Sequence, residues 1–354
     1  MDVQKINITE FINSAFTYLL LDVRSPAEYE HAHIPGAKSL PLFDNEQRAI
    51  VGTTYKKQSR EDAIKIALPF FGDKMLQMVE TVEKWSSVFE KEHNLKPFVV
   101  VHCWRGGMRS AAVAWLLDLY GFKVIQINGG YKAYRNWVIE KYTQPYSLKV
   151  LGGYTGSGKT ETLRALATTG KAVVDLEGLA KHKGSAFGAL GQVAQPSQEM
   201  FENILATSLL EQEKKGDCIW VEDESQRIGT VMIPAAFFAQ IKNSTCYFMR
   251  IPFEERLSFI VQQYGGFAKE PLIEATNRIQ KRLGGLETKN AVAYILEGEI
   301  SNAFSILLKY YDKWYDKFSK AEKNNKEDAV IFNIQWLDAH KVDAITNSKL
   351  LMGL

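Results

Sequence analysis

The sequence predicts an α/β protein with two domains, each built around a parallel β-sheet. The chain has 354 residues, whereas a single domain typically holds roughly 100–200 residues. Short apolar runs alternate with helical patterns, which is typical of βαβ units. A second series of strand-like runs begins at Leu148, after a polar stretch at residues 140–147. An apolar fraction of 46% supplies enough material for a core in each half.

In the first half, predicted strands end next to polar or glycine-rich segments. Phe98–Val101 is a β-branched run after a proline, which favours a buried strand. Ser110–Tyr120 has a helical pattern that Gly121 would end. Two further strands are expected at Thr17–Val23 and Val124–Ile127. Strands that alternate with helices in this way predict a parallel sheet.

We interpret residues 140–147, which are polar and contain a proline, as a linker. The predicted domains are therefore residues 1–140 and 141–354. From about Glu254 to Lys320 the pattern is largely helical, so the second domain should have a helical C-terminal part. Its strands are predicted at Leu148–Leu151, Ala172–Asp175, Cys218–Glu222 and Thr245–Ile251.

Charge and cysteine usage exclude several classes of protein. The net charge is +2, and basic and acidic residues nearly balance in both halves, so any RNA contact must use a local patch. No stretch approaches the ~20 apolar residues of a membrane helix, and Met1–Glu10 lacks the apolar run of a signal peptide. We therefore expect a cytoplasmic protein without a membrane partner. The three cysteines form no CxxC pair, so neither a metal site nor a disulfide framework is expected.

The first candidate site is the segment around Cys103. A buried strand ends at this cysteine, two glycines follow, and a helix begins at about Arg109. A strand–loop–helix of this kind directs backbone N–H groups inward and adds the positive end of the helix dipole. Such a nest would favour the thiolate of Cys103, the nucleophilic form, or would hold a phosphate. Arg105 and Arg109 add positive charge, whereas Cys218 and Cys246 are interpreted as inert core residues.

The second candidate site is a P-loop, G-x-x-x-x-G-K-T, between a predicted strand and a helical stretch. Its glycines let backbone N–H groups face a di- or triphosphate, and its lysine reaches the outer phosphates. The threonine would lie near a Mg²⁺ ion if one binds. The predicted phosphate-binding residues are Gly153, Gly156, Ser157, Gly158, Lys159 and Thr160.

Acidic residues follow two predicted strands of the second domain. Glu222 and Glu224 end one strand in the manner of a Walker B motif, and Asp175 ends another. They could hold a metal or position a hydroxyl at the carboxyl edge of the sheet, and the alternative is an ordinary acid cluster at a strand end.

The Cys103 segment carries a family resemblance. The stretches Asp22–Tyr29, His33–Ala37 and Asn128–Tyr131 resemble the signatures of rhodanese domains, in which the loop cysteine carries sulfur as a persulfide. The loop from Cys103 to Arg109 spans seven residues, one more than is common in sulfur-carrying rhodaneses, and it also fits the His-Cys-x5-Arg form of cysteine phosphatases. A longer loop indicates a pocket for a phosphate-sized anion. We therefore favour chalcogen chemistry with a phosphate-bearing donor over phosphate hydrolysis.

The order of the two halves resembles the tRNA 2-selenouridine synthase family over nearly the whole chain. Beyond the cysteine loop and the P-loop, the segments that carry this resemblance are His182–Gly188, Gln195–Gln198 with Phe201–Asn203, Glu224–Ser225 with Ile228–Gly229, Arg282–Gly285 and Tyr310–Asp312. The resemblance implies a rhodanese-like domain followed by a P-loop NTPase-like domain.

The resemblance also implies a reaction and its co-substrates. Members of the family convert 2-thiouridine to 2-selenouridine at the wobble position of tRNAs for Lys, Glu and Gln. The uridine sulfur first attacks geranyl diphosphate, which gives S-geranyl-2-thiouridine, and selenophosphate then supplies selenium as the geranylated sulfur leaves. An enzyme that produces selenophosphate would be the donor partner. A P-loop suits a diphosphate as well as ATP, so Lys159 is expected to hold the leaving pyrophosphate, and the choice between the two ligands stays open.

The sequence indicates the residues that would contact RNA less clearly than it indicates the two loops. His182, Lys183 and Arg227 are loop candidates for contacting phosphate or RNA. The aromatic and lysine-rich stretch Tyr310–Phe318 could stack bases, but an aromatic stripe at helical spacing is more often packed in a core.

Three other functions fit parts of the pattern. The first is a sulfurtransferase fused to a small-molecule P-loop kinase, which would need ATP but no tRNA. The second is a non-enzymatic module that binds phosphates or oxyanions. The third is a cysteine phosphatase, which would depend on Cys103.

Overall fold

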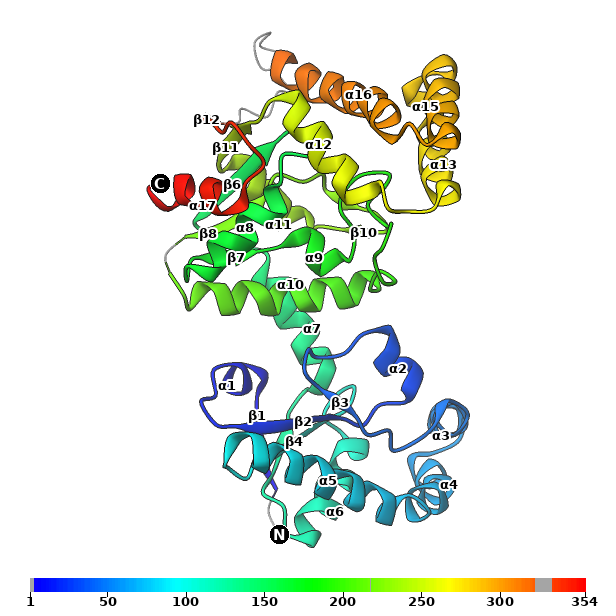
Figure 1. The fold of residues 1–354 in the computed structure, drawn as a ribbon. Coiled ribbons are helices and arrows are strands. Elements are labelled where there is room, and N and C mark those ends of the chain that lie inside the picture. The colour runs from blue at the N-terminus through cyan, green and yellow to red at the C-terminus, as the bar shows by residue number, and fades with distance from the viewer. Residues whose placement is uncertain (1–2, 217, 322–332) are drawn as a thin grey trace. The chain divides into compact units, whose positions relative to one another are not determined.

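The computed structural model describes residues 3–216, 218–321 and 333–354, with the side chains of residues 314–321 left out. The chain divides into two compact units, Met1–Lys141 and Tyr142–Leu354. Each unit contains a five-stranded sheet of parallel strands within the described residues, flanked by helices (Figure 1). The predicted α/β class is confirmed.

The sheet of the first unit has the strand order β1-β5-β4-β2-β3. Its strand β4 lies in the middle, because β2 and β5 pair with it on either side. Because the strands alternate with helices, each helix carries the chain back to the end of the sheet where the previous strand began. The next strand therefore runs in the same direction. The strands are β1 Gln4–Ile6, β2 Tyr18–Asp22, β3 Lys38–Ser39, β4 Phe98–His102 and β5 Val124–Ile127, and the helices are α1 Ile8–Ile12, α2 Pro26–His31, α3 Asn45–Lys57, α4 Arg60–Gly72, α5 Met75–His93, α6 Met108–Tyr120 and α7 Gly130–Lys141.

The sheet of the second unit has the strand order β12-β11-β6-β8-β7. The chain leaves the central strand β6 towards β7 and later returns to its other side at β11, so the order reverses at β6, where ligands bind in open α/β sheets. The strands are β6 Leu148–Gly153, β7 Ala172–Val174, β8 Ile219–Glu222, β9 Arg227–Ile228, β10 Val231–Met232, β11 Thr245–Arg250 and β12 Ile334–Asp338. The helices are α8 Lys159–Thr168, α9 Leu176–Ala180, α10 Gln198–Glu213, α11 Ala235–Asn243, α12 Phe253–Tyr264, α13 Lys269–Arg278, α14 Gln280–Leu283, α15 Gly285–Glu297, α16 Ile300–Ala321 and α17 Ala344–Met352.

Two hydrophobic clusters organise the second unit. One joins β6, β8 and β11 to α8 and α17, and it contains Leu151, Leu163 and Leu351. The other lies among α12, α13, α15 and α16, which form the helical part seen in yellow and orange in Figure 1. The second cluster therefore gives the predicted helical region a core of its own, which lies beside the P-loop sheet.

The predicted linker is not a free connection. Residues 140 and 141 end α7, and the following residues are fixed to the second unit. The Gln240 side-chain amide donates to the backbone oxygens of Tyr142 and Gln144 at 3.1 and 3.0 Å, and accepts from the Tyr146 N–H at 2.9 Å. These contacts tie residues 142–146 to the second unit, and the boundary between the two units, between Lys141 and Tyr142, falls inside the predicted linker.

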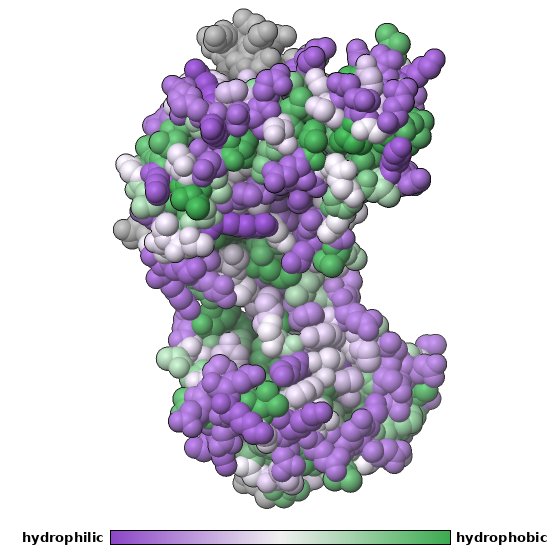
Figure 2. Space-filling model, in the orientation of Figure 1, coloured by the Kyte–Doolittle hydropathy of each residue, from purple (hydrophilic) through white to green (hydrophobic). Residues whose placement is uncertain are grey.

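The visible surface is largely polar in both units, with apolar residues in separate patches, as the ordinary composition predicts (Figure 2). No helix within residues 3–216, 218–321 and 333–354 is both long and apolar enough to cross a membrane.

Candidate functional site

The Cys103 loop is held by the turn that follows β5. The Tyr131 N–H donates to the Cys103 carbonyl at 2.8 Å, and the Lys132 N–H donates to that of Trp104 at 2.9 Å. Gly130 has a φ of +54°, and a Cβ there would collide with the Cys103 carbonyl oxygen. Only glycine combines this left-handed backbone with so close an approach. The glycines after β5 therefore fix the position of the cysteine.

Polar side chains hold the loop from inside. The Cys103 sulfur lies 3.2 Å from the Ser110 hydroxyl, at the start of α6. The Gln126 amide donates to that hydroxyl and to the Gly106 carbonyl, each at 2.8 Å. Cys103 is only 3% exposed. Ser110 and Gln126 were not predicted as site residues, because a serine in a helix and a glutamine in a strand carry no distinctive sequence signal.

The two predicted arginines differ in their surroundings. Arg109 donates to the Glu28 carboxylate of α2 at 2.8 Å, with a second contact at 3.4 Å. Burial alone would raise the pKa of Glu28, but Arg109 holds it below its usual value, so the pair is charged and mutually neutralised. Arg105 lies exposed in the loop. Of the two, Arg105 is therefore the arginine whose charge is available to an incoming anion.

A buried ionic group lies behind the loop. The Arg24 guanidinium donates to Asp22 at 2.6–2.9 Å and lies 3.8 Å from the centre of the Tyr131 ring. Burial would raise the pKa of Asp22, but His102 and Arg24 lower it overall. Burial lowers the pKa of His102, and the Asp22 carboxylate beside it acts in the opposite direction. This group stabilises the rhodanese signature and the strand end from which Cys103 emerges.

The P-loop lies where predicted, between β6 and α8. Gly156 and Gly158 have φ values of +81° and +69°, and a Cβ on Gly156 would come within 2.9 Å of Ile260. The Lys159 ammonium donates to the Gly153 carbonyl at 3.1 Å and so folds back over the loop. These features are those of a cradle for the outer phosphates of a ligand.

Two residues that the sequence did not single out complete the P-loop. Glu177, on α9, accepts a 2.7 Å hydrogen bond from the Thr160 hydroxyl. Arg256, on α12 and almost fully buried, donates to the Thr155 carbonyl at 3.1 Å and pairs with Asp312 of α16 at 2.7–2.9 Å. The Arg256 guanidinium therefore ties the P-loop backbone to α16, and we call this contact the arginine clamp.

The predicted acids lie close to Glu177. Burial, together with the neighbouring carboxylates, raises the pKa of Glu222 well above its usual value and raises that of Glu224 to about 8. Asp175, by contrast, accepts from the Gly178 N–H at 2.6 Å and pairs with Arg164 at 2.7 Å, so it caps α9. Within the residues that the structure describes, no three His, Cys, Asp or Glu side chains are arranged to hold a metal ion.

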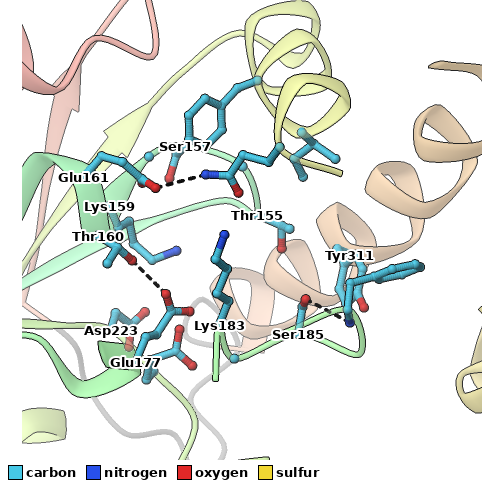
Figure 3. Close-up of a pocket in the computed structure, with 18 of the residues that line it drawn as sticks. Thr155, Ser157, Lys159, Thr160, Glu161, Glu177, Lys183, Ser185, Asp223 and Tyr311 are labelled. Atoms are coloured by element: carbon cyan, nitrogen blue, oxygen red, sulfur yellow. Dashed lines mark hydrogen bonds between the residues drawn. The ribbon is translucent and has the colours of Figure 1, made fainter. Parts of the chain in front are cut away.

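A cavity of about 820 Å³ opens over the P-loop. Figure 3 shows Lys159 and Lys183 directed into the same space, with Thr160 and Glu177 on one side and Tyr311 on the other. One part of the lining is polar and comes from the P-loop, Glu177, Lys183 and Glu224. The other part is apolar and comes from α12, α16 and the loop before residue 188; its members include Phe187, Ile260, Tyr264, Phe304, Leu307 and Leu308.

The predicted RNA-contacting residues differ in exposure, although the His182 ring packs against Gly229, whose carbonyl accepts from Arg227 at 3.2 Å. Lys183 lines the cavity, and Arg227 is exposed on β9. His182 is buried, and burial lowers its pKa, so its neutral ring offers no charge to a phosphate. In the Tyr310–Phe318 stretch, for which a core-packing helix was favoured over base stacking, the side chains of residues 314–318 lie outside the described part of the chain.

Of the two cysteines outside the loop, Cys246 lies in the core as predicted and Cys218 does not. Cys246 is buried on β11, where a Cβ on Gly152 of β6 would come within 2.7 Å of its sulfur. Cys218 is half-buried beside β8.

Comparison with known proteins bears on both halves. A model of the rhodanese-like domain matches residues 9–136. A model described as the tRNA 2-selenouridine synthase AAA domain matches residues 146–344, more than half of the chain. The chain belongs to the tRNA 2-selenouridine synthase family. The resemblance seen in the sequence is thereby confirmed.

Curated members of this family are similar over most of their length. The chain is 37% identical over 287 residues to the tRNA 2-selenouridine synthase of Hydrogenovibrio crunogenus, covering 75% of this chain and 76% of that protein. It is 39% identical over 251 residues to that of Nitrosomonas europaea, covering 69% and 63% of the two chains. It is 32% identical over 361 residues to that of Shewanella woodyi, covering 91% and 94%.

Proposed function

We propose that this protein is a transferase that converts 2-thiouridine to 2-selenouridine at the wobble position of tRNA, through S-geranyl-2-thiouridine. The curated relatives carry the name of this activity, and they match both domains of the chain. The proposed co-substrates are geranyl diphosphate and selenophosphate. The proposed partners are the tRNAs for Lys, Glu and Gln and an enzyme that makes selenophosphate, all in the cytoplasm.

The observation that carries this proposal is the mixed lining of the P-loop cavity. A P-loop alone accepts any diphosphate. Here its phosphate cradle shares one cavity with an apolar wall on α12 and α16. Such a wall suits a hydrocarbon chain, because contact with it removes apolar surface from water. We therefore favour geranyl diphosphate over ATP as the ligand of this site.

The first step follows from this placement. The uridine sulfur attacks the allylic carbon, the C–O bond to the diphosphate breaks, and the N3 proton of the base is lost. Lys159 and the P-loop N–H groups offset the charge that builds up on the leaving pyrophosphate. The Thr160 hydroxyl already donates to Glu177, and the acids nearby do not form a metal cluster within the described residues. A Mg²⁺ ion that binds with the diphosphate would be held by the Thr160 hydroxyl and by the phosphates of the ligand itself, so it would not need such a cluster.

The second step is assigned to the Cys103 loop. The selenium of selenophosphate attacks C2 of the base, and the C–S bond breaks so that geranyl thiol leaves with a proton from solvent. Water then attacks phosphorus, the P–Se bond breaks, phosphate is released, and N3 of the 2-selenouridine takes up a proton. S-geranylation makes the departure of sulfur possible, because a thiolate is a better leaving group than the sulfur of a thiocarbonyl. The loop N–H groups and the exposed Arg105 would hold the phosphate of selenophosphate. Cys103, Arg105 and Arg109 therefore serve the selenium step in this proposal, with Arg109 acting through Glu28.

The direct test uses the full chain, 2-thiouridine tRNA and both co-substrates, with mass spectrometry of the released nucleosides. We expect S-geranyl-2-thiouridine with geranyl diphosphate alone and 2-selenouridine when selenophosphate is added. Cys103→Ala should accumulate the geranylated nucleoside, and Cys246→Ala is the control for loss of a buried thiol. Absence of both products with the unaltered protein would overturn the proposal. Loss of the geranylated nucleoside in Cys103→Ala would show that the cysteine also serves the first step.

A further inference from the structure

Four basic side chains of the described residues line the P-loop cavity, and they differ in what already compensates their charge. They are Lys159, Arg164, Lys183 and Lys242. The Arg164 guanidinium lies 2.7 Å from the Asp175 carboxylate, and the Lys242 ammonium lies 2.8 Å from that of Asp223. Both of these charges are therefore compensated before any ligand binds.

The charge of Lys159 is also partly engaged. Its ammonium donates to the Gly153 carbonyl at 3.1 Å. Burial raises the pKa of Glu177 and of Glu224, and Lys159 acts on both in the opposite direction. A diphosphate that enters this space approaches two carboxyl groups as well as Lys159, so a further cation would offset the repulsion between like charges.

Lys183 is the lysine whose charge is free for this purpose. No carboxylate in the described part of the chain forms an ion pair with its ammonium. The ammonium lies 5.5 Å from the centre of the Tyr264 ring, a contact that attracts the cation but uses none of its three donors. The side chain is half-buried and is directed into the space that Lys159 also faces (Figure 3).

The loop that carries Lys183 is fixed beside the P-loop. The next residue, Gly184, has a φ of +66°, and a Cβ there would come within 2.7 Å of the Glu224 carboxylate and 3.0 Å of that of Glu177. Glu177 in turn accepts a 2.7 Å hydrogen bond from the Thr160 hydroxyl of the P-loop. The backbone next to Lys183 therefore lies against the same carboxylate that contacts the P-loop.

We propose that Lys183 is a second cationic contact for the diphosphate, alongside Lys159. The inference rests on the proposed function, because it assigns Lys183 to the geranylation step, and it narrows the earlier expectation of a contact with phosphate or RNA. As the allylic C–O bond breaks, its electron pair stays on the oxygen of the leaving pyrophosphate. Both ammonium groups donate to this anion and keep their protons. Because the negative charge on the pyrophosphate grows as the bond breaks, the contact accelerates the step in addition to binding the ligand.

The test replaces Lys183 by methionine, which keeps an unbranched stem against Tyr264 but removes the charge. Single-turnover geranylation of 2-thiouridine tRNA should slow about 10²-fold. The inhibition constant of inorganic pyrophosphate should rise about tenfold, because a hydrogen bond to a charged group is lost. Lys183→Arg keeps the charge, so it should recover part of the lost rate and affinity. Lys181→Met is the matched control, since Lys181 is exposed at the end of α9 and does not line the cavity.

A second readout needs no turnover. Pyrophosphate should raise the melting temperature of the second unit in the full chain, and this rise should be smaller in Lys183→Met than in Lys181→Met. The affinity for tRNA, measured without a prenyl donor, should be equal in the two variants. If tRNA binds Lys183→Met more weakly while the inhibition constant of pyrophosphate stays within about twofold of its original value, Lys183 contacts RNA and the proposal is overturned.

The outcomes also separate this inference from the proposed function. If the unaltered protein transfers no geranyl group, the proposed function fails, and the melting temperatures alone decide whether Lys183 contacts a diphosphate. If it transfers geranyl and Lys183→Met behaves like Lys181→Met in rate and in pyrophosphate inhibition, the function stands and the assignment of Lys183 fails. Lys183→Gln replaces Lys183→Met if the latter does not fold.

Discussion

Replacing Arg256 by methionine should destabilise the second unit and loosen its P-loop. The guanidinium donates to the carbonyls of Ile251 and Thr155 and forms a two-point pair with Asp312. Breaking a buried pair by removing one partner costs about 3–5 kcal/mol. The Asp312 side chain is 21% exposed to solvent, so water would compensate part of its charge in the variant. We therefore expect the free energy of unfolding to fall by an amount near the lower end of that range.

The measurement is the thermal transition of the second unit in the full chain. For a domain of this size, a loss of about 3 kcal/mol lowers the melting temperature by roughly 6–12 °C. The control is Arg250→Met, which removes an exposed arginine 4.2 Å from the centre of the Trp336 ring. That change should cost no more than about 1 kcal/mol.

A double variant isolates the cause. In Arg256→Met with Asp312→Leu no charge is left without its partner, so part of the lost stability should return. Pyrophosphate should also bind Arg256→Met more weakly than the unaltered protein, because the Thr155 carbonyl is no longer held. A melting temperature of Arg256→Met within 2 °C of that of the unaltered protein would refute the idea that the clamp stabilises this unit.

Three further changes test other parts of the two sites. Lys159→Ala should slow single-turnover geranylation about 10²-fold, because it removes one donor to the leaving pyrophosphate, whereas Lys171→Ala, outside the cavity, should not. Glu224→Gln should change stability little at pH 5 and raise it at pH 8. The folded-state pKa of Glu224, about 8, lies above its ordinary value of 4.5, so the folded unit loses stability as the pH rises between these values; equal pH dependence in both proteins would contradict this. Gly130→Ala should lower the melting temperature of the first unit more than Gly36→Ala does, since both positions have positive φ but only Gly130 lacks room for a Cβ. A similar loss in both variants would show that backbone strain alone matters.

The sequence by itself located both candidate sites, the Cys103 loop and the P-loop. Each is a strand–loop–helix contained in a short stretch of chain, and its glycines and its cysteine or lysine lie within eight residues of one another. Local backbone sterics and the helix N-terminus decide such a structure, so the motif is visible before the fold is known. The buried strands β4, β6, β8 and β11 were predicted for a similar reason, since apolar β-branched and aromatic runs mark them.

Residues that act through distant contacts were not predicted. Arg256 lies about 100 positions from Thr155, and Glu28 lies 81 positions from Arg109. In the sequence Arg256 resembles an ordinary helical charge, and Glu28 lies in the rhodanese-like stretch Asp22–Tyr29 without any sign of its partner. Only the parallel sheets, which bring the carboxyl ends of distant strands to one edge, place these residues at the sites.

The edge strand β12 and the apolar wall of the cavity also depend on tertiary contacts that the local sequence does not show. Residues 334–338 pair with β11 only because the chain returns to the sheet after α16. In the sequence, Phe304 is one of several apolar residues whose spacing predicts the apolar face of an amphipathic helix. The sequence determined that this helix has an apolar face, whereas the packing of α12 against α16 and the Arg256–Asp312 pair decided that part of this face lines the P-loop cavity. The physical reason is that periodicity depends on neighbours within one helix, while a cavity depends on elements that meet only in the folded chain.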